Sequence, residues 1–274
     1  MTSMSSLSRN TPDRPAGTVK NSTACLLLHG LATSPSDLAA MVPVLEGLGC
    51  FVDLQALPGH GGTVEEFRAS YFPDWLRSAE DRLKALLRDY ETVILVGFSM
   101  GASISLHLAS RYAVSGAFLL APAWQAYRLF PLRHSSWLAL TPLLKYIRPV
   151  VETGPPRPES REIAPCEGHT SAIYLPQLHS LVLGLEDMRQ RLPGVRCPVH
   201  MMYDLNDRVC PPEFATKIAR TISSADVTIR FTRMNERITS HHMLPTHRDT
   251  KNLVLRELRA FIVGLPSLSV SPPI

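Results

Sequence analysis

Short continuous runs of apolar residues recur along the chain, and β-branched residues and leucine are frequent in them. Such runs are typical of strands that are buried on both faces of a sheet, where no polar side is needed. The pattern predicts six strands, within residues 24–28, 50–57, 92–97, 115–121, 197–203 and 226–233.

Between these runs, apolar residues recur at helical spacing. Ser34 and Pro35 form a helix cap followed by a first-turn proline, and residues 73–90 place their large apolar side chains on one face. Further helices are expected after Ser99, after Pro212 and over residues 247–263. This alternation predicts an α/β fold, a mostly parallel sheet with helices on both faces and right-handed crossovers.

The alternation stops over residues 123–194 and then resumes. This proline-rich stretch contains two expected helices, at 136–147 and 176–192, but no convincing core of its own. We therefore expect one domain with an inserted helical lid, flanked by disordered ends. The expected boundaries are a lead-in at 1–21, a core at 22–122 and 195–264, the lid at 123–194 and a flexible tail at 265–274.

The expected lid helices carry apolar stripes that allow two interpretations. In the second helix the stripe includes Leu178, Leu181, Leu185 and Met188. These residues could simply dock the lid on the core. They could also line an apolar ligand pocket, since such pockets are mostly apolar with few polar groups. The sequence favours neither interpretation.

Composition excludes several classes of protein. The chain has 274 residues, a net charge of only +4 and no long Lys/Arg run, so neither nucleic acid nor an anionic membrane is an expected partner. No apolar stretch is long enough to span a bilayer, and the first twenty residues lack the apolar core of a signal peptide. The five cysteines are scattered without a Cys-x-x-Cys pair, which favours reduced thiols in a cytoplasmic protein. No metal-ligand spacing and no phosphate-binding or dinucleotide-binding motif is present, so neither metal nor cofactor is expected.

The segment Gly97-Phe98-Ser99-Met100-Gly101 lies where an expected strand becomes an expected helix. Such a turn bends sharply, pushes the Ser99 side chain out of the sheet and places the next N–H at the positive end of the helix. A tight turn with an incidental serine is the alternative. The strand before and the helix after the motif favour a nucleophile.

A serine nucleophile requires a base and an orienting acid. In this type of fold they follow the serine in the order acid, then histidine, each after a later strand. Asp204 and Asp207 follow the strand at 197–203. His241, His242 and His247 follow the strand at 226–233.

Five segments together resemble the α/β-hydrolases, and within them the small-lidded carboxylesterases and monoacylglycerol-lipase-like enzymes. They are LLLHGL (26–31), LPGHG (57–61), GFSMG (97–101), DRVCPP (207–212) and SHHML (240–244). The resemblance implies that Asp207 is the acid and that His242 is the base. Asp204 stands where the family often has glycine, and His241 where it often has glycine or asparagine.

The same resemblance implies an oxyanion hole built from two backbone N–H groups. One belongs to Met100, directly after the nucleophile, and the other to Leu31, after His29 and Gly30. His29 is expected to hold this loop rather than to transfer protons.

These residues lead to the hypothesis of a serine hydrolase that cleaves small-molecule carboxylic esters with an apolar acyl group through an acyl-serine, without a cofactor. A thioesterase or a carbon–carbon bond hydrolase would use the same residues, because a fold does not determine the reaction. A non-catalytic receptor that retains the pocket is an alternative of another class. The sequence gives no indication of oligomeric state.

Overall fold

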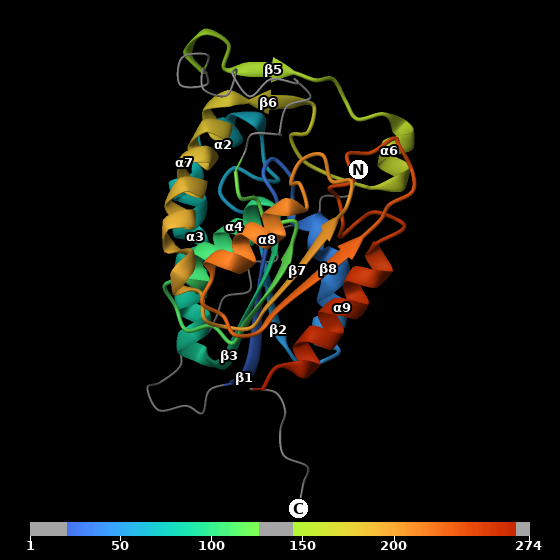
Figure 1. Cartoon of the computed structure of the whole chain (residues 1–274). Coiled ribbons are helices and arrows are strands. Elements are labelled where there is room, and N and C mark those ends of the chain that lie inside the picture. Colours follow the sequence, from blue (N-terminus) through green and yellow to red (C-terminus); the bar gives the residue numbers. More distant parts are fainter. Residues whose placement is uncertain (1–20, 126–144, 267–274) are drawn as a thin grey trace, which may run out of the picture.

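The computed structural model describes residues 21–125 and 145–266. Six strands form one sheet in the order β2-β1-β3-β4-β7-β8, and every pairing is parallel (Figure 1). All six match predicted strands. Their bounds are β1 Asn21–Leu28, β2 Phe51–Leu54, β3 Tyr90–Phe98, β4 Gly116–Leu120, β7 Val199–Asp204 and β8 Val227–Thr232.

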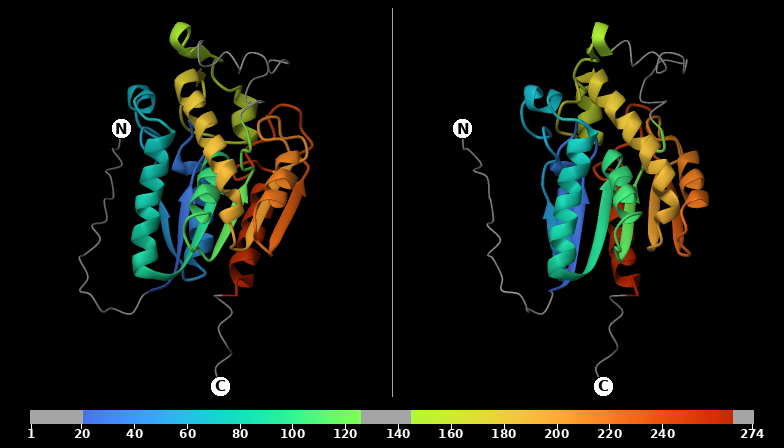
Figure 2. Two further views of the ribbon diagram at one scale, coloured as in Figure 1. Left: turned by 60° about the vertical axis from the view of Figure 1, so that its left-hand side comes forward. Right: turned by 90° about the vertical axis from the view of Figure 1, so that its left-hand side faces the viewer.

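Helices cover both faces of this sheet, which confirms the predicted fold class. The 3-10 helix η1 (Pro35–Met41), α1 (Val42–Glu46) and α9 (Lys251–Gly264) contact one another on one face. The helices α3 (Phe72–Asp89) and α4 (Met100–Ala109) cover the other face. In the right-hand view of Figure 2 these two helices lie in front of the sheet and α9 lies behind it. The helix α8 (Glu213–Thr221) follows Pro212, as predicted.

Two predicted helices begin differently in the structure. The Ser34 hydroxyl caps η1 by accepting a hydrogen bond from Ser36 N, but the first turns are 3-10 rather than α-helical. Because Pro43 has no N–H to continue an α-helical hydrogen-bond ladder from the preceding turn, the α-helix α1 starts only at Val42. The last helix starts at Lys251 rather than at residue 247, because Thr250 Oγ1 donates to Leu244 O within a series of turns.

Five short elements of the described residues are absent from the sequence prediction, and one of them is the 3-10 helix η3 (Leu192–Gly194). The helix α2 (Val64–Arg68) follows a capping box. Within the expected lid, β5 (Val150–Glu152) pairs antiparallel with β6 (Ala172–Tyr174), and α6 (Pro158–Ile163) lies between them in sequence. Most of the expected lid helix at 136–147 lies outside the described residues.

The second lid helix is present as α7 (Leu175–Arg191) and packs on α3 and α4. Its stripe of Leu178, Leu181, Leu185 and Met188 is at most 2% exposed. Gly184 allows this close packing, because a Cβ there would lie 2.1 Å from the Phe72 ring. The stripe therefore packs α7 on the core, as the first of the two interpretations expects.

Polar contacts also fix α7 to the core. Ser180 Oγ accepts a hydrogen bond from Phe72 N at 3.1 Å, and Gln177 Nε2 donates to Arg68 O at 2.7 Å. The helix α7 is thus a fixed part of the α3–α4 layer.

The described chain extends slightly beyond the expected core. Asn21 belongs to β1, and Leu265 is buried. Residues 1–20 and 267–274, where we expected a lead-in and a tail, lie outside the described residues. Within 21–125 and 145–266, no helix is long and apolar enough to cross a membrane.

Candidate active site

Ser99 occupies the sharp turn between β3 and α4, with φ 53° and ψ −116°. A Cβ on Gly97 would lie 2.5 Å from Ala102 Cα, and a Cβ on Gly101 would lie 2.0 Å from Leu28 O. Both contacts are with backbone atoms, so neither position accepts a side chain without moving a strand or helix. The two glycines explain how α4 can begin directly against the end of β1.

Ser99, His242 and Asp207 form one hydrogen-bonded row. His242 Nε2 lies 2.9 Å from Ser99 Oγ, and His242 Nδ1 lies 2.8 Å from Asp207 Oδ2. The residues follow β3, β8 and β7, and parallel strands end at the same edge of the sheet. The other carboxylate oxygen, Asp207 Oδ1, accepts from Val209 N at 2.8 Å and Cys210 N at 2.9 Å, which fixes the plane of the carboxylate.

These partners determine the tautomer of His242. An ionised carboxylate can only accept a hydrogen bond, so Nδ1 carries the imidazole proton towards Asp207. The lone pair of Nε2 then faces the Ser99 hydroxyl, which donates to it. This arrangement is able to remove the hydroxyl proton.

The neighbouring candidates, Asp204 and His241, belong to a separate network. Asp204 Oδ2 accepts from Thr232 Oγ1 at 3.0 Å and from Met234 N at 2.7 Å. His241 has φ 60°, and its Nε2 lies 2.7 Å from Glu236 O. His241 Nδ1 lies 3.3 Å from Asp204 Oδ1. The two adjacent histidines therefore have different carboxylate neighbours.

Glu236, which the sequence analysis did not single out, is central to this second network. Burial alone would raise the pKa of Glu236, but the Thr239 hydroxyl, the N–H groups of Thr239 and Ile238, and His247 together lower it to about 2. Its Oε1 lies 3.2 Å from His241 Nε2 and 3.4 Å from His247 Nε2. The ionised carboxylate thus ties together the loop that carries His242.

The loop after β1 is held by His29. Its Nε2 accepts from Leu57 N at 3.0 Å, so its Nδ1 carries the proton that is donated to Gly30 O at 2.9 Å. Burial lowers the pKa of His29 to about 4. Thr33 Oγ1 also donates to Gly30 O, at 3.1 Å. His29 is therefore a neutral support of the loop that contains Leu31.

The two expected oxyanion donors come from segments in direct contact. Leu31 follows the end of β1 closely, and Met100 is the first residue of α4. The absent side chain of Gly101 allows α4 to approach the carbonyls of Leu28 and His29. Both N–H groups thus belong to the carboxyl edge of the sheet, beside Ser99.

Residues 25–249 match the alpha/beta hydrolase family. The chain belongs to this family. This chain is similar to the thermostable monoacylglycerol lipase of Bacillus sp. (strain H-257), with 25% identity over 237 residues. The aligned region covers 86% of this chain and 89% of the relative.

Two solved structures share the fold of the α/β-hydrolase. One comes from work on LipS and LipT, two metagenome-derived lipolytic enzymes, with a TM-score of 0.75, 22% identity and coverage of 89% of this chain and 95% of that one. The other is the monoacylglycerol lipase of Paleococcus ferrophilus, with a TM-score of 0.72, 19% identity and coverage of 89% and 96%. The chain thus has the fold of these two α/β-hydrolases over about nine-tenths of its length.

A buried carboxyl group lies near the candidate site of this α/β-hydrolase. Asp37 in η1 is 2% exposed, and neither of its oxygens has a hydrogen-bond partner among the described residues. Burial raises the pKa of Asp37 to about 7, although the Thr33 hydroxyl opposes this rise. The charge of Glu167 raises the pKa further, and that of His242 lowers it. The sequence analysis did not single out Asp37.

Replacement of Asp37 by asparagine is expected to stabilise the protein more at pH 8 than at pH 5. The folded-state pKa of about 7 exceeds the unfolded value near 3.9, so the stability contribution of Asp37 is present below pH 4 and is lost as pH rises through 7. At ~1.4 kcal/mol per pKa unit, the gain should be roughly 2–3 kcal/mol larger at pH 8. Urea unfolding at both pH values measures it. Asp81→Asn, at an exposed position on α3, is the control, and a pH-independent effect of Asp37→Asn would contradict the argument.

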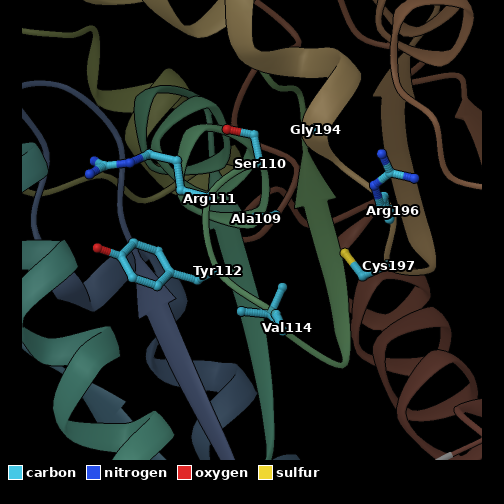
Figure 3. Close-up of a pocket in the computed structure, with 9 residues that line it drawn as sticks. Ala109, Ser110, Arg111, Tyr112, Val114, Gly194, Arg196 and Cys197 are labelled. Carbon is cyan, nitrogen blue, oxygen red and sulfur yellow. The ribbon is translucent and has the colours of Figure 1, made fainter.

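A pocket lies at the end of the sheet opposite to Ser99. This pocket of about 430 Å³ is where β4 and β7 begin (Figure 3). It is lined by Ala109, Ser110, Arg111, Tyr112, Ala113, Val114, Gly194, Arg196 and Cys197. Because Ser99, Asp207 and His242 all follow strand ends at the other edge, this pocket is not part of the candidate site. No group of three or more His, Cys, Asp or Glu residues within the described ranges could hold a metal ion.

Proposed function

We propose that the chain is a carboxylic ester hydrolase in which Ser99 is the nucleophile, His242 the base and Asp207 the acid that orients the imidazole. The observation that carries the proposal is the hydrogen-bonded row in which His242 Nε2 is 2.9 Å from Ser99 Oγ and Nδ1 is 2.8 Å from Asp207. A serine hydroxyl is a weak nucleophile unless a base of this kind is in place.

In the proposed reaction, His242 takes the hydroxyl proton as Ser99 Oγ attacks the ester carbonyl. The N–H groups of Leu31 and Met100 stabilise the oxyanion of the tetrahedral intermediate. The intermediate collapses, His242 protonates the leaving alcohol, and an acyl-serine remains. Water, deprotonated by His242, then attacks the acyl group, and the acid is released.

The substrate class that we propose is an ester with an apolar acyl group, of the carboxylesterase or monoacylglycerol-lipase type. The 25% identity to a monoacylglycerol lipase over most of both chains supports this class. We also propose a cytoplasmic site of action, which is supported by the five cysteines being free thiols.

Hydrolysis rates across p-nitrophenyl esters from C2 to C16, and on a monoacylglycerol, test the proposal. We expect turnover that is abolished by a fluorophosphonate and is faster for medium or long chains than for acetate. Thioesters and a diketone are run in parallel, because the same residues could cleave either. Folded protein that binds an ester without cleaving any of these compounds would instead be a receptor.

A further inference from the structure

The lid segment Ile163–His169, here called the strap, is fixed at both ends to loops of the candidate site. Arg248 N donates to Ile163 O at 2.9 Å, and His169 N donates to Ala32 O at 2.8 Å. Arg248 belongs to the β8–α9 loop that carries His242. Ala32 belongs to the loop after β1 that carries Leu31. The strap therefore joins two loops that come together only in the folded chain.

Contact between the strap and the oxyanion loop requires glycine at position 168. Gly168 has φ 131°, and a Cβ there would lie 2.3 Å from Ala32 O and 2.8 Å from Thr33 Cα. Both contacts are with backbone atoms, which a rotamer change cannot relieve. Gly154, also in the expected lid, has φ 76° with nothing within 4 Å of the Cβ position.

The loop that the strap contacts is held in a strained conformation. Ala32 has φ 57°, a left-handed value that a residue with a Cβ adopts at a cost of about 1 kcal/mol or more. Such a conformation persists when its surroundings determine it. The hydrogen bond from His169 N to Ala32 O, together with the Gly168 backbone lying against Thr33, supplies those surroundings.

Fixing the carbonyls of this loop also fixes the direction of the Leu31 N–H. The Gly30 carbonyl and the Leu31 N–H belong to one planar trans peptide, so they point in opposite directions. His29 and the Thr33 hydroxyl hold the Gly30 carbonyl on one side of Leu31. The strap holds the Ala32 carbonyl on the other side. The peptide groups around Leu31 are therefore held from both directions.

The strap is itself anchored in the core through an aromatic cluster. The His169 ring lies 5.2 Å from the Phe67 ring, and the Tyr174 ring lies 5.1 Å from Phe67 on another side. Phe67 is fully buried. The His169 ring thus holds the end of the strap against a rigid part of the molecule.

We propose that the strap positions the oxyanion loop, with Gly168 and His169 as positioning residues that aim the Leu31 N–H at the oxyanion formed on the substrate. The inference rests on the proposed function, because only attack by Ser99 generates that oxyanion. The strap acts on the Leu31 N–H through Ala32 and Thr33, which it contacts directly.

Gly168→Ala is the test, with Gly154→Ala as a control at a position of positive φ in the same lid. We expect Gly168→Ala to lower kcat about 10–100-fold with KM changed by less than ~3-fold, since loss of one oxyanion donor costs 10²–10³-fold. Affinity for a trifluoromethyl ketone, which forms a tetrahedral adduct with the serine, should fall by the same factor as kcat. Gly154→Ala should leave both quantities unchanged.

His169→Ala is a second variant that introduces no clash. It retains the backbone N–H to Ala32 but removes the ring that packs on Phe67, so a smaller loss of ~3–10-fold is expected in both quantities. Folded Gly168→Ala and His169→Ala proteins with wild-type kcat and ketone affinity would overturn the proposal. An equal loss of kcat and ketone affinity in Gly154→Ala would also overturn the proposal, because strain elsewhere in the expected lid would then be enough to lower both quantities.

Amide hydrogen exchange separates failure of this inference from failure of the proposed function. Exchange of the peptide covering residues 29–34 should be faster in Gly168→Ala than in wild type or Gly154→Ala, whatever reaction the protein catalyses. If wild-type protein cleaves no ester but this exchange difference is present, the proposed ester hydrolase function is wrong, whereas the proposed contact of the strap with the oxyanion loop is supported. If esters are cleaved and exchange is unchanged, the strap is wrong and the function stands.

Discussion

Replacement of Ser99 by alanine is expected to lower kcat/KM for the best ester by at least ~10⁴-fold. The variant keeps the expected oxyanion donors and the binding surface but lacks the atom that forms the acyl-enzyme, so only residual catalysis remains. The hydroxyl contacts His242 Nε2 at 2.9 Å and also the thiol of Cys210, and alanine introduces no new contact there. The melting temperature should change by only a few degrees.

The control is Ser105→Ala on the same helix. Ser105 is buried and donates to Gly101 O at 2.8 Å, one turn back along α4, so its removal perturbs the helix without touching the row. This variant should retain wild-type kcat. Undiminished ester turnover by carefully purified Ser99→Ala protein would refute Ser99 as the nucleophile.

Asp207→Asn is expected to lower kcat by about 10³–10⁴-fold while the fold is retained. In the wild-type protein Val209 N and Cys210 N donate to Asp207 Oδ1, and the side-chain oxygen of asparagine can still accept both hydrogen bonds. Its amide would then face His242 Nδ1 as a donor. The imidazole must carry its proton on Nε2 to accept that bond, and it can no longer take the proton of Ser99.

Asp204→Asn provides the matched comparison, since Asp204 is the last residue of β7 and Asp207 lies in the loop directly after it. Asp204 accepts from Thr232 Oγ1, Met234 N and Asn206 N, so an amide there replaces an acceptor with a donor in a buried site. We expect a loss of stability of about 1–3 kcal/mol and a change in kcat below ~10-fold. Urea unfolding and steady-state kinetics measure both variants. A larger loss of kcat in folded Asp204→Asn than in Asp207→Asn would reverse the assignment of the acid.

The inner strands β1, β3, β4 and β7 were predictable because burial on both faces leaves a continuous apolar signal that does not depend on the partner strand, whereas the edge strands β2 and β8 are partly exposed. The order of the strands has no such local signal. Short elements were missed for a related reason: β5 and β6 have three residues each, too few for a period to be visible. The five-residue helix α2 has a capping box, Thr63 with Glu66, that marks its start in the sequence.

The residues of the candidate site likewise differ in whether the local sequence indicates their role. Ser99 has a local signal, and the order of Asp207 and His242 follows from the resemblance to a family. Asp37 and Glu236 have no such signal, because burial and contacts made in the folded chain determine their pKa values. Asp37 is influenced by Glu167 and His242, more than a hundred residues away in sequence. The strap was likewise hidden, since a glycine in a proline-rich stretch reads as a loop residue.

The close approach of α4 to the sheet has a consequence for laboratory evolution of this protein. A Cβ at position 97 would lie 2.5 Å from Ala102 Cα, and a Cβ at position 101 would lie 2.0 Å from Leu28 O. A mutation at either position must therefore displace the strand or helix around the nucleophile. Libraries that seek altered substrate range should keep these two codons constant.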